Sequence, residues 1–252
     1  MSAFTRVAAA IWVLATLMLL VFPLLGTPDS FRLYYSNALQ TSSSLISAAI
    51  CFYAMSAFPA GSPLRKVWGA MGAGVLAWGI GATIFGAYPL VTGGEETPYP
   101  YFSDIGYLAT GPLMIIGLLI FKRSTGLESP LWGKLLAVVL LVGSGVLAYR
   151  ANAEGLSDPS LAMRATSLGY LIFDPLLLAV TALTATGFRG GEVGAAWWYA
   201  VIGILLYFIA NQAYTFLVLS ETYATGHPID IGWMLGFGFI AWAALKTRRL
   251  VS

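Results

Sequence analysis

The sequence predicts an all-α integral membrane protein, a bundle of eight transmembrane helices formed from helical hairpins. Of its 252 residues, 58% are hydrophobic and 10% are charged, whereas soluble domains carry about 25% charged residues. Apolar stretches recur along the chain at about the 20-residue length that crosses a hydrocarbon core. Lysine and arginine concentrate in alternate connections between these stretches, a pattern typical of proteins that cross a membrane several times.

The eight predicted spans form one membrane domain over 1–252. In order, they are 5–26, 34–58, 65–90, 102–122, 131–149, 159–186, 194–220 and 229–247. Residues that favour turns separate each span from the next. These breaks are Gly26–Asp29, Pro59–Pro63, Gly93–Pro100, Ser129–Pro130, Ser157–Pro159, Gly190–Gly191 and Gly226–Pro228. The first span follows Arg6 as in a signal peptide, but no small-residue cleavage site follows it, so we expect it to remain as a helix.

Charge asymmetry predicts that both termini are cytoplasmic, in a cell inner (plasma) membrane. Ten of the 13 basic residues fall on the side of the N-terminus: Arg6, Arg65, Lys66, Lys122, Arg123, Lys134, Arg189, Lys246, Arg248 and Arg249. The other three are Arg32, Arg150 and Arg164. Acidic residues show the opposite bias: Asp29, Glu95, Glu96, Asp104, Glu154, Asp158, Glu221 and Asp230 lie on or near the other side. Positive residues mark the cytoplasmic side, and eight spans return the chain to it.

Composition also excludes several classes of protein and site. The net charge is +2 and the basic residues are scattered, which excludes a nucleic-acid binder with a basic face. The single cysteine, Cys51, excludes an internal disulfide. The single histidine, His227, excludes a haem held by two histidines of this chain, and no metal site is expected. The last span carries a lysine only at its cytoplasmic end, Lys246, so a covalently bound retinal is excluded.

A weak internal repeat with a step of 63 residues supports the hairpin organisation. The triplet Gly106–Leu108 recurs as Gly169–Leu171 and again as Gly232–Met234. Each unit would contain one outgoing span, an external loop and one returning span. An even number of helices per unit keeps the units parallel, unlike the inverted repeats of many secondary transporters. The alternative is that glycine–aromatic pairs are simply common at membrane interfaces.

Two acidic residues belong to the repeated motif. Asp104 and Asp230 precede the repeated glycines by two residues, so each falls in the first turn of a returning helix, where free N–H groups and the helix dipole favour an anion. The repeated glycines, Gly106 and Gly232, allow close helix approach, and Tyr107 and Trp233 are expected at the outer interface. These residues are interpreted either as helix caps with aromatic anchors or as the rim of an outward-facing site.

Other polar residues reach a similar depth in their spans. They are Asn37, Gln40 and Thr41–Ser44 in the second span, Arg164, Thr166 and Ser167 in the sixth, and Asn211, Gln212 and Thr215 in the seventh. Polar side chains in hydrocarbon favour the bundle interior or a wet cavity. Their shared depth predicts a cavity open to the external side, with ordinary hydrogen bonding between helices as the alternative.

Asp174 is the most unusual residue of the sequence. It lies about 15 residues into the sixth span, which is about 22 Å along a helix, and Pro175 follows it. An acidic residue inside the membrane is a functional candidate by default. It is interpreted as a carboxyl that accepts a proton or contacts a ligand, or as a hydrogen-bonded aspartic acid at a helix kink.

Aromatic residues and glycines complete the set of candidates. Trp68, Trp132, Trp197 and Trp198 begin outgoing helices and are expected to anchor the cytoplasmic interface. Trp78, Phe85 and Trp242 are deeper, where core packing and a hydrophobic ligand pocket are both open. The third span carries a glycine run that suits tight helix contacts, or a flat lipophilic cofactor such as a bound lipid, quinone or pigment.

Part of the chain resembles a known type of module. The matching stretches are Arg65–Trp68, Trp78–Gly81, Pro100–Leu108, Gly111–Leu113 and His227–Trp233. They resemble the multi-spanning membrane input region of bacterial diguanylate cyclases, phosphodiesterases and sensor histidine kinases. The resemblance implies a helical input bundle that senses a signal. In those proteins a cytoplasmic output domain follows, whereas this chain stops at Ser252, so we expect an input-like bundle without an output domain.

Together these features predict a non-catalytic sensory or ligand-binding bundle with an outward-facing pocket, signalling to a separate membrane or cytoplasmic protein. The candidate ligand-binding residues are Asp104, Tyr107, Arg164, Asp174, Asn211, Gln212, Asp230 and Trp233. One alternative is a structural or cofactor-holding subunit of a respiratory or photosynthetic membrane complex. A second is a small proton-coupled transporter that uses Asp174. An enzyme is not expected, because no nucleophile–base pair emerges.

Overall fold

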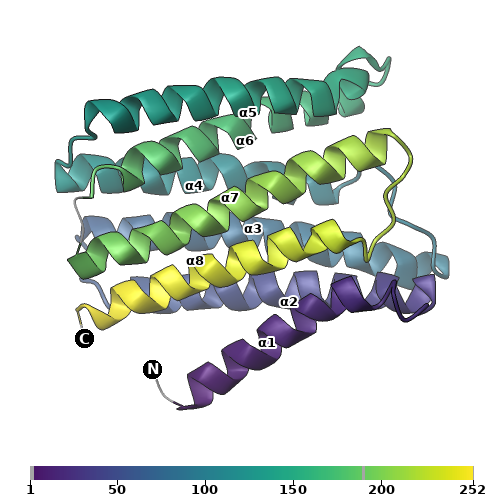
Figure 1. Ribbon diagram of the computed structural model, residues 1–252, viewed down its shortest axis with the longest axis horizontal. Coiled ribbons are helices and arrows are strands. Elements are labelled where there is room, and N and C mark those ends of the chain that lie inside the picture. The colour runs from purple at the N-terminus through teal and green to yellow at the C-terminus, as the bar shows by residue number, and fades with distance from the viewer. Residues whose placement is uncertain (1–2, 189–190, 252) are drawn as a thin grey trace.

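A computed structural model describes residues 3–188 and 191–251, and within these ranges every regular element is a helix (Figure 1). The helices are α1 (Ala3–Val21), α2 (Asp29–Met55), α3 (Pro63–Thr92), α4 (Ser103–Thr125), α5 (Leu131–Ser157), α6 (Leu161–Ala185), α7 (Gly191–Leu219) and α8 (Ile231–Arg249). A short 3-10 turn, η1 (Pro228–Asp230), leads into α8. The predicted helical membrane bundle is confirmed at this level.

Seven of the eight helices are long and apolar enough to cross a membrane. The exception is α1, whose apolar run Thr5–Val21 is shorter. The predicted first span extends too far, because α1 ends at Val21 and turns follow it up to Gly26. The fifth span extends further than predicted, since α5 continues to Ser157. The added turns carry Arg150 and other polar residues. A span predicted from apolar length stops before such residues, whereas the helix itself can continue through them.

Most predicted breaks coincide with helix ends for local reasons. Pro63 occupies the start of α3, where its missing N–H has no helical partner to lose. Gly93 and Gly126 end α3 and α4 with φ of +79° and +61°, and this left-handed conformation favours glycine. Arg189 and Gly190, which belong to the predicted connection between the sixth and seventh spans, lie outside the described residues.

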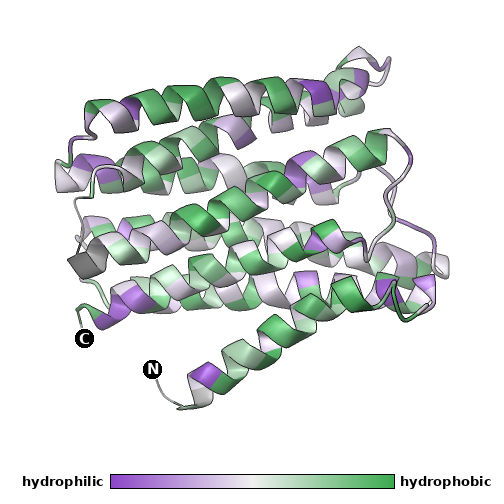
Figure 2. Ribbon diagram, in the orientation of Figure 1, coloured by the Kyte–Doolittle hydropathy of each residue, from purple (hydrophilic) through white to green (hydrophobic). Residues whose placement is uncertain are grey.

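Helices that follow one another in the chain run antiparallel, and both termini lie at one end of the bundle (Figure 1). Helix α1 packs on α8 and α2 at one edge, and α5 packs on α6 and α7 at the other. Much of α5 is exposed apolar surface, including Leu135, Val138, Val139 and Val142. Such a surface suits contact with lipid chains, and Figure 2 shows apolar residues along the helices with hydrophilic ones gathered toward their ends.

The repeated glycines lie at close helix contacts, as expected from the sequence. A Cβ on Gly106 would collide with the carbonyl oxygen of Ala77 on α3, and one on Gly232 would lie 2.8 Å from the Cβ of Ala210 on α7. Because only glycine permits this approach, both positions bring a returning helix against its hairpin partner. The repeat itself remains a prediction.

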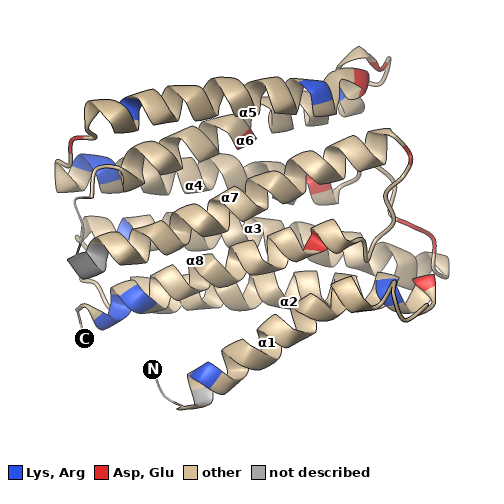
Figure 3. Cartoon of the chain, in the orientation of Figure 1, with Lys and Arg blue, Asp and Glu red and all other residues tan. Residues whose placement is uncertain are grey.

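Charges separate between the two ends of the bundle (Figure 3). The end that holds both termini is called the basic end, and its residues include Arg65, Lys66, Lys122, Arg123, Lys134, Lys246, Arg248 and Arg249. The opposite end is called the acidic end, and its residues include Asp29, Glu95, Glu96, Asp158 and Glu221. The ends therefore present opposite charge to the two faces of a membrane.

Stacked rings fill the core near the basic end. The ring centroids of Phe121 and Trp197 are 4.0 Å apart, those of Trp68 and Trp197 5.7 Å, and those of Phe121 and Phe188 5.6 Å. We call these four residues the aromatic stack. Trp68 and Trp197 are buried, so their expected role as interfacial anchors is wrong. Trp197 stacks on Phe121 of α4 and Trp68 stacks on Trp197, whereas Trp132 and Trp198 are exposed.

Candidate functional site

A small cavity lies in the half of the bundle toward the acidic end. Its volume is about 20 Å³, enough for about one water molecule. Six helices and the connection between α7 and η1 supply its wall: Gln40, Trp78, Phe85, Tyr107, Tyr170, Asn211, Tyr214, Tyr223 and Trp233. We call it the aromatic cavity. Three buried aspartates, one from each of α4, α6 and η1, lie behind this wall and accept hydrogen bonds from its polar groups.

Asp230 accepts four hydrogen bonds. Its Oδ2 accepts from Ser36 Oγ at 2.7 Å, from Gln40 Nε2 at 3.3 Å and from the backbone N–H of Gly226 at 2.9 Å. Its Oδ1 accepts from the hydroxyl of Tyr223 at 2.9 Å. The carboxyl group therefore joins α2, the α7–η1 connection and the start of α8, and two of its donors belong to the cavity wall.

Asp104 has a similar position at the start of α4. Its carboxylate accepts from the backbone N–H of Tyr101 at 2.8 Å and from the hydroxyl of Tyr170 at 2.8 Å. Asp104 lies in the first turn of α4, as the sequence predicts, but it is not a helix cap: the N-cap is Phe102, which has no side-chain cap bond, and the first bond reaches back to a residue before the helix. The second bond reaches α6 and orients a ring of the cavity wall.

Asp174 lies deeper and is held by two amides of α7. Its oxygens accept from Asn211 Nδ2 at 3.1 and 3.3 Å and from Gln212 Nε2 at 2.8 Å. The orientation of Asn211 is determined by its other neighbour, because the indole N–H of Trp233 donates to Asn211 Oδ1 at 2.7 Å and an indole can only donate. A chain of hydrogen bonds thus runs from Trp233 in the wall through Asn211 to Asp174.

All three aspartates are paired with neutral donors. Amide, hydroxyl and backbone N–H groups supply every donor described above for Asp104, Asp174 and Asp230, and none is lysine or arginine. Each carboxyl group therefore serves as a hydrogen-bond acceptor for its neighbours. The described part of the cavity wall also contains no basic residue. The site is therefore a wall of aromatic rings with three buried carboxyl groups behind it.

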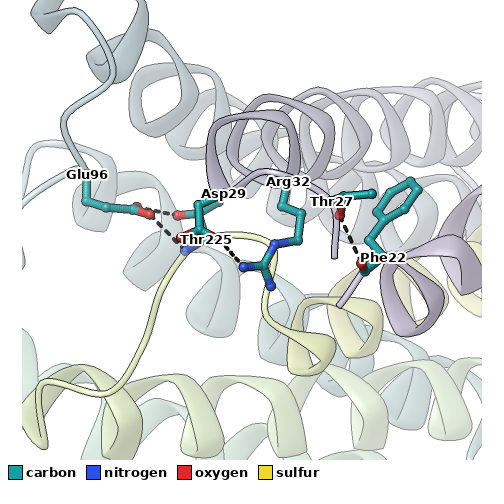
Figure 4. A network of polar contacts seen from close by, with 6 residues as sticks. All are labelled: Phe22, Thr27, Asp29, Arg32, Glu96 and Thr225. Atoms are coloured by element: carbon teal, nitrogen blue, oxygen red, sulfur yellow. Dashed lines mark hydrogen bonds and ion pairs between the residues drawn. The ribbon is translucent and has the colours of Figure 1, made fainter. Parts of the chain in front are cut away.

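The α7–η1 connection, residues 220–227, closes over the site at the acidic end. Glu96, from the connection between α3 and α4, accepts from the backbone N–H of Thr225 at 3.1 Å and from its Oγ1 at 2.7 Å (Figure 4). Gly226 has φ of +94° and lies against Arg32, which forms an ion pair with Asp29 (Figure 4). These contacts join the α3–α4 connection, the α7–η1 connection and the start of α2 at the acidic end, close to Asp230.

Two titratable residues of this connection have shifted pKa values. Burial, and next the charge of Asp230, raise the pKa of Tyr223 well above its usual value, so Tyr223 remains a hydroxyl donor at neutral pH. Burial, and next the charge of Arg32, lower the pKa of His227. A neutral imidazole is consistent with its contact, in which Nδ1 accepts from the backbone N–H of Ile229 at 3.3 Å.

Most of the predicted site residues lie around this cavity. Tyr107, Asn211 and Trp233 line it, while Asp104, Asp174, Gln212 and Asp230 lie directly behind the wall. Arg164 does not join them, because it is exposed on α6. Trp233 is buried rather than an interfacial anchor, since its indole N–H turns inward to Asn211.

Sequence reasoning overlooked several wall residues, and the repeat contains the signal for one of them. Tyr170 occupies the same repeat position as Tyr107 and Trp233, and all three line the cavity. One aromatic ring from each of α4, α6 and α8 therefore meets at the site. Tyr214 and Tyr223 have no such signal, because their approach depends on the packing of α7 and on the path of the connection that follows it.

Compared with known protein families, with curated proteins and with solved structures, the chain matches none. The geometry of the bundle itself must therefore support any functional assignment.

Proposed function

We propose that this chain is a non-catalytic, sensory membrane bundle that binds a ligand from the acidic end and signals to a separate protein at the basic end. The observation that carries the proposal is the difference between the two halves of the core. The half near the acidic end contains a cavity and three buried carboxyl groups. The half near the basic end is filled by the aromatic stack.

This difference favours binding over transport. A transporter must open its central site to each side in turn. Here Phe121 and Trp197, 4.0 Å apart, lie between the cavity and the basic end, in a core that packs to solid-like density. Loss of uptake in an Asp174→Asn variant that still folds would support the transport alternative instead.

Two helices connect the cavity with the basic end and are suited to carry a signal. Helix α7 carries Asn211 at the cavity and Trp197 in the aromatic stack. Helix α8 carries Trp233 at the cavity and Arg248 at the basic end, where the guanidinium lies 3.8 Å from the ring centroid of Tyr53 and donates to its carbonyl oxygen at 2.7 Å. A shift of either helix on ligand binding would change contacts at the basic end.

The orientation of the protein follows from the charge distribution. The basic end holds most of the lysine and arginine residues (Figure 3), and such residues mark the cytoplasmic side of the inner membrane. A sensory use of the site therefore places the partner protein on the cytoplasmic side.

Cysteine labelling tests the one-sided cavity. Cys51 is fully buried, and a Cys51→Ala background removes it. In that background we expect Phe85→Cys, which replaces a ring of the cavity wall with a smaller side chain and so enlarges the cavity, to react with a small membrane-impermeant thiol reagent added at the acidic end only. Ala200→Cys, near the aromatic stack, should react from neither side. Glu95→Cys and Arg65→Cys serve as matched controls for the two ends. Labelling of Phe85→Cys from the basic end would contradict the proposal.

A further inference from the structure

We propose that the α7–η1 connection, residues 220–227, is the gate of the aromatic cavity, and that Glu96 is the latch that holds this gate closed. The inference rests on the proposed function, because it states how a ligand reaches the same site from the acidic end. The position of Tyr223, the backbone at both ends of the connection and the bonds that hold it each support the gate.

The wall of the cavity is helical except where this connection contributes to it. Of the described wall residues, all but Tyr223 lie on helices, and a helix backbone is held by a continuous ladder of hydrogen bonds. The cavity has a volume of about 20 Å³, which holds about one water molecule. A larger ligand therefore requires part of the wall to move, and a segment outside the helices can move with fewer broken bonds.

Tyr223 is the wall residue that the connection supplies. Its ring meets that of Tyr214 edge-on, with 4.8 Å between the centroids, and its hydroxyl donates to Asp230 Oδ1 at 2.9 Å. Figure 1 shows the connection from α7 toward α8 at the end of the bundle away from both termini. Displacement of the connection would withdraw the ring of Tyr223 from the wall and open the cavity toward the acidic end.

The backbone at both ends of the connection suits hinges, which are typically a few loop residues that absorb a change in φ and ψ. Glu221 has φ of +55° and Gly226 has φ of +94°. Positive φ is uncommon for residues other than glycine, so movement of the chain would release Glu221 from a disfavoured conformation. A Cβ on Gly226 would lie 2.7 Å from the Cβ of Arg32, whereas glycine fits there and can adopt a wide range of φ on opening.

Two acidic side chains hold the connection in place near its second hinge. The backbone N–H of Gly226 donates to Asp230 Oδ2 at 2.9 Å. The backbone N–H of Thr225 donates to Glu96 at 3.1 Å and its Oγ1 donates to Glu96 at 2.7 Å (Figure 4). Glu96 is exposed, so water competes for its two bonds and lowers their net contribution. The latch therefore keeps the gate closed at rest and can be broken at low cost.

The rate at which Phe85→Cys is labelled from the acidic end, in the full chain with Cys51→Ala, tests the gate. Labelling requires opening, so its rate should follow the fraction of open molecules. Glu96→Ala removes both bonds to Thr225 and should accelerate labelling about fivefold. Thr225→Val keeps the backbone N–H and loses only the Oγ1 bond, so an acceleration of about twofold is expected. Glu95→Ala, from the adjacent exposed position, is the matched control and should not change the rate.

Several outcomes would overturn the inference. If labelling occurs from the acidic end alone but at the same rate in Glu96→Ala, Thr225→Val and the background, the gate is wrong and the one-sided cavity stands. An acceleration by Glu95→Ala equal to that by Glu96→Ala also removes the latch. If Glu96→Ala does not fold, the comparison of Thr225→Val with Glu95→Ala decides by the same criterion. Labelling from the basic end overturns the proposed function whatever the rates from the acidic end, and no labelling of any variant overturns both.

Discussion

Near the basic end, the rings of Trp68, Phe121 and Trp197 stack face to face, whereas near the acidic end the rings of Trp78, Tyr107 and Trp233 meet at tilted angles around a cavity. Both regions are aromatic and buried, and α3, α4 and α7 contribute rings to both. They differ in hydrogen bonding: buried aspartates accept from polar groups of the cavity wall, whereas the indole N–H groups of the stack have no partner among the described residues.

The comparison shows that aromatic content alone does not distinguish a structural core from a binding site. The stacked rings gain close contact, with no hydrogen bond described for the indoles of Trp68 and Trp197. At the cavity, Tyr170 and Tyr223 donate to carboxylates behind the wall, and Trp233 donates to the amide oxygen of Asn211. The cavity region therefore has more side-chain hydrogen bonds and less close ring packing than the aromatic stack, which is typical of a binding site rather than of a structural core.

The largest effect is expected from breaking the aromatic stack. Phe121→Ala removes the ring that contacts both Trp197 and Phe188 and should reduce the free energy of unfolding by about 3–5 kcal/mol. Thermal unfolding followed by circular dichroism measures the loss. Trp198→Ala, next to Trp197 but exposed, should change stability little. A similar loss in both variants would mean that the stack is not the stable half of the core.

A smaller effect is expected from Asn211→Leu at the cavity. The change leaves Asp174 without one amide donor and Trp233 without its acceptor, and unsatisfied buried groups cost about 1–3 kcal/mol. The same unfolding measurement applies, and tryptophan fluorescence should report the released indole of Trp233. Stability equal to wild type would show that the hydrogen-bond chain from Trp233 to Asp174 does not form.

Loosening the external connection should affect only the acidic end. Glu96→Ala removes both hydrogen bonds to Thr225 and should cost about 1 kcal/mol. Hydrogen exchange of residues 220–227 should accelerate, while the exchange of α7 near Trp197 stays the same. Glu95→Ala is the matched control from the adjacent exposed position. Equal exchange in the two variants would argue against the Glu96–Thr225 contact.

The smallest effect is expected from pH at His227. Its pKa lies below the ordinary value of 6.5 in the folded protein, so the unfolded chain binds the proton more readily. Stability should therefore fall slightly as pH decreases through about 6.5. The decrease in melting temperature between about pH 7.5 and 5.5 should be larger in wild type than in His227→Gln, because other titrating groups are common to both. An equal decrease would remove His227 as a contributor.

Sequence reasoning located the helices and many polar residues of the site because both follow from local chemistry. Span length reports membrane thickness, and a residue such as Asp174 is conspicuous where water is absent. The glycine–aromatic repeat also placed Gly106 and Gly232 at close helix contacts. The boundaries of α1 and α5 were less well predicted, since apolar length does not determine where a helix stops.

The direction of individual side chains was the weaker part of the prediction. Trp68, Trp197 and Trp233 were expected at interfaces because tryptophan prefers them, yet all three are buried. Arg164 was grouped with the site by depth alone and is exposed. Depth along a helix can be counted from the sequence, but rotation about the helix axis depends on which neighbours pack around it.

By itself, the sequence determined a helical membrane bundle, the approximate spans and the opposite charge of the two ends, because hydrophobic length and charge act residue by residue. Only the tertiary structure decided that Tyr107, Tyr170 and Trp233 share one cavity and that Asp104, Asp174 and Asp230 support its wall. These contacts join residues far apart in the chain, and they form only when helix packing brings particular faces together.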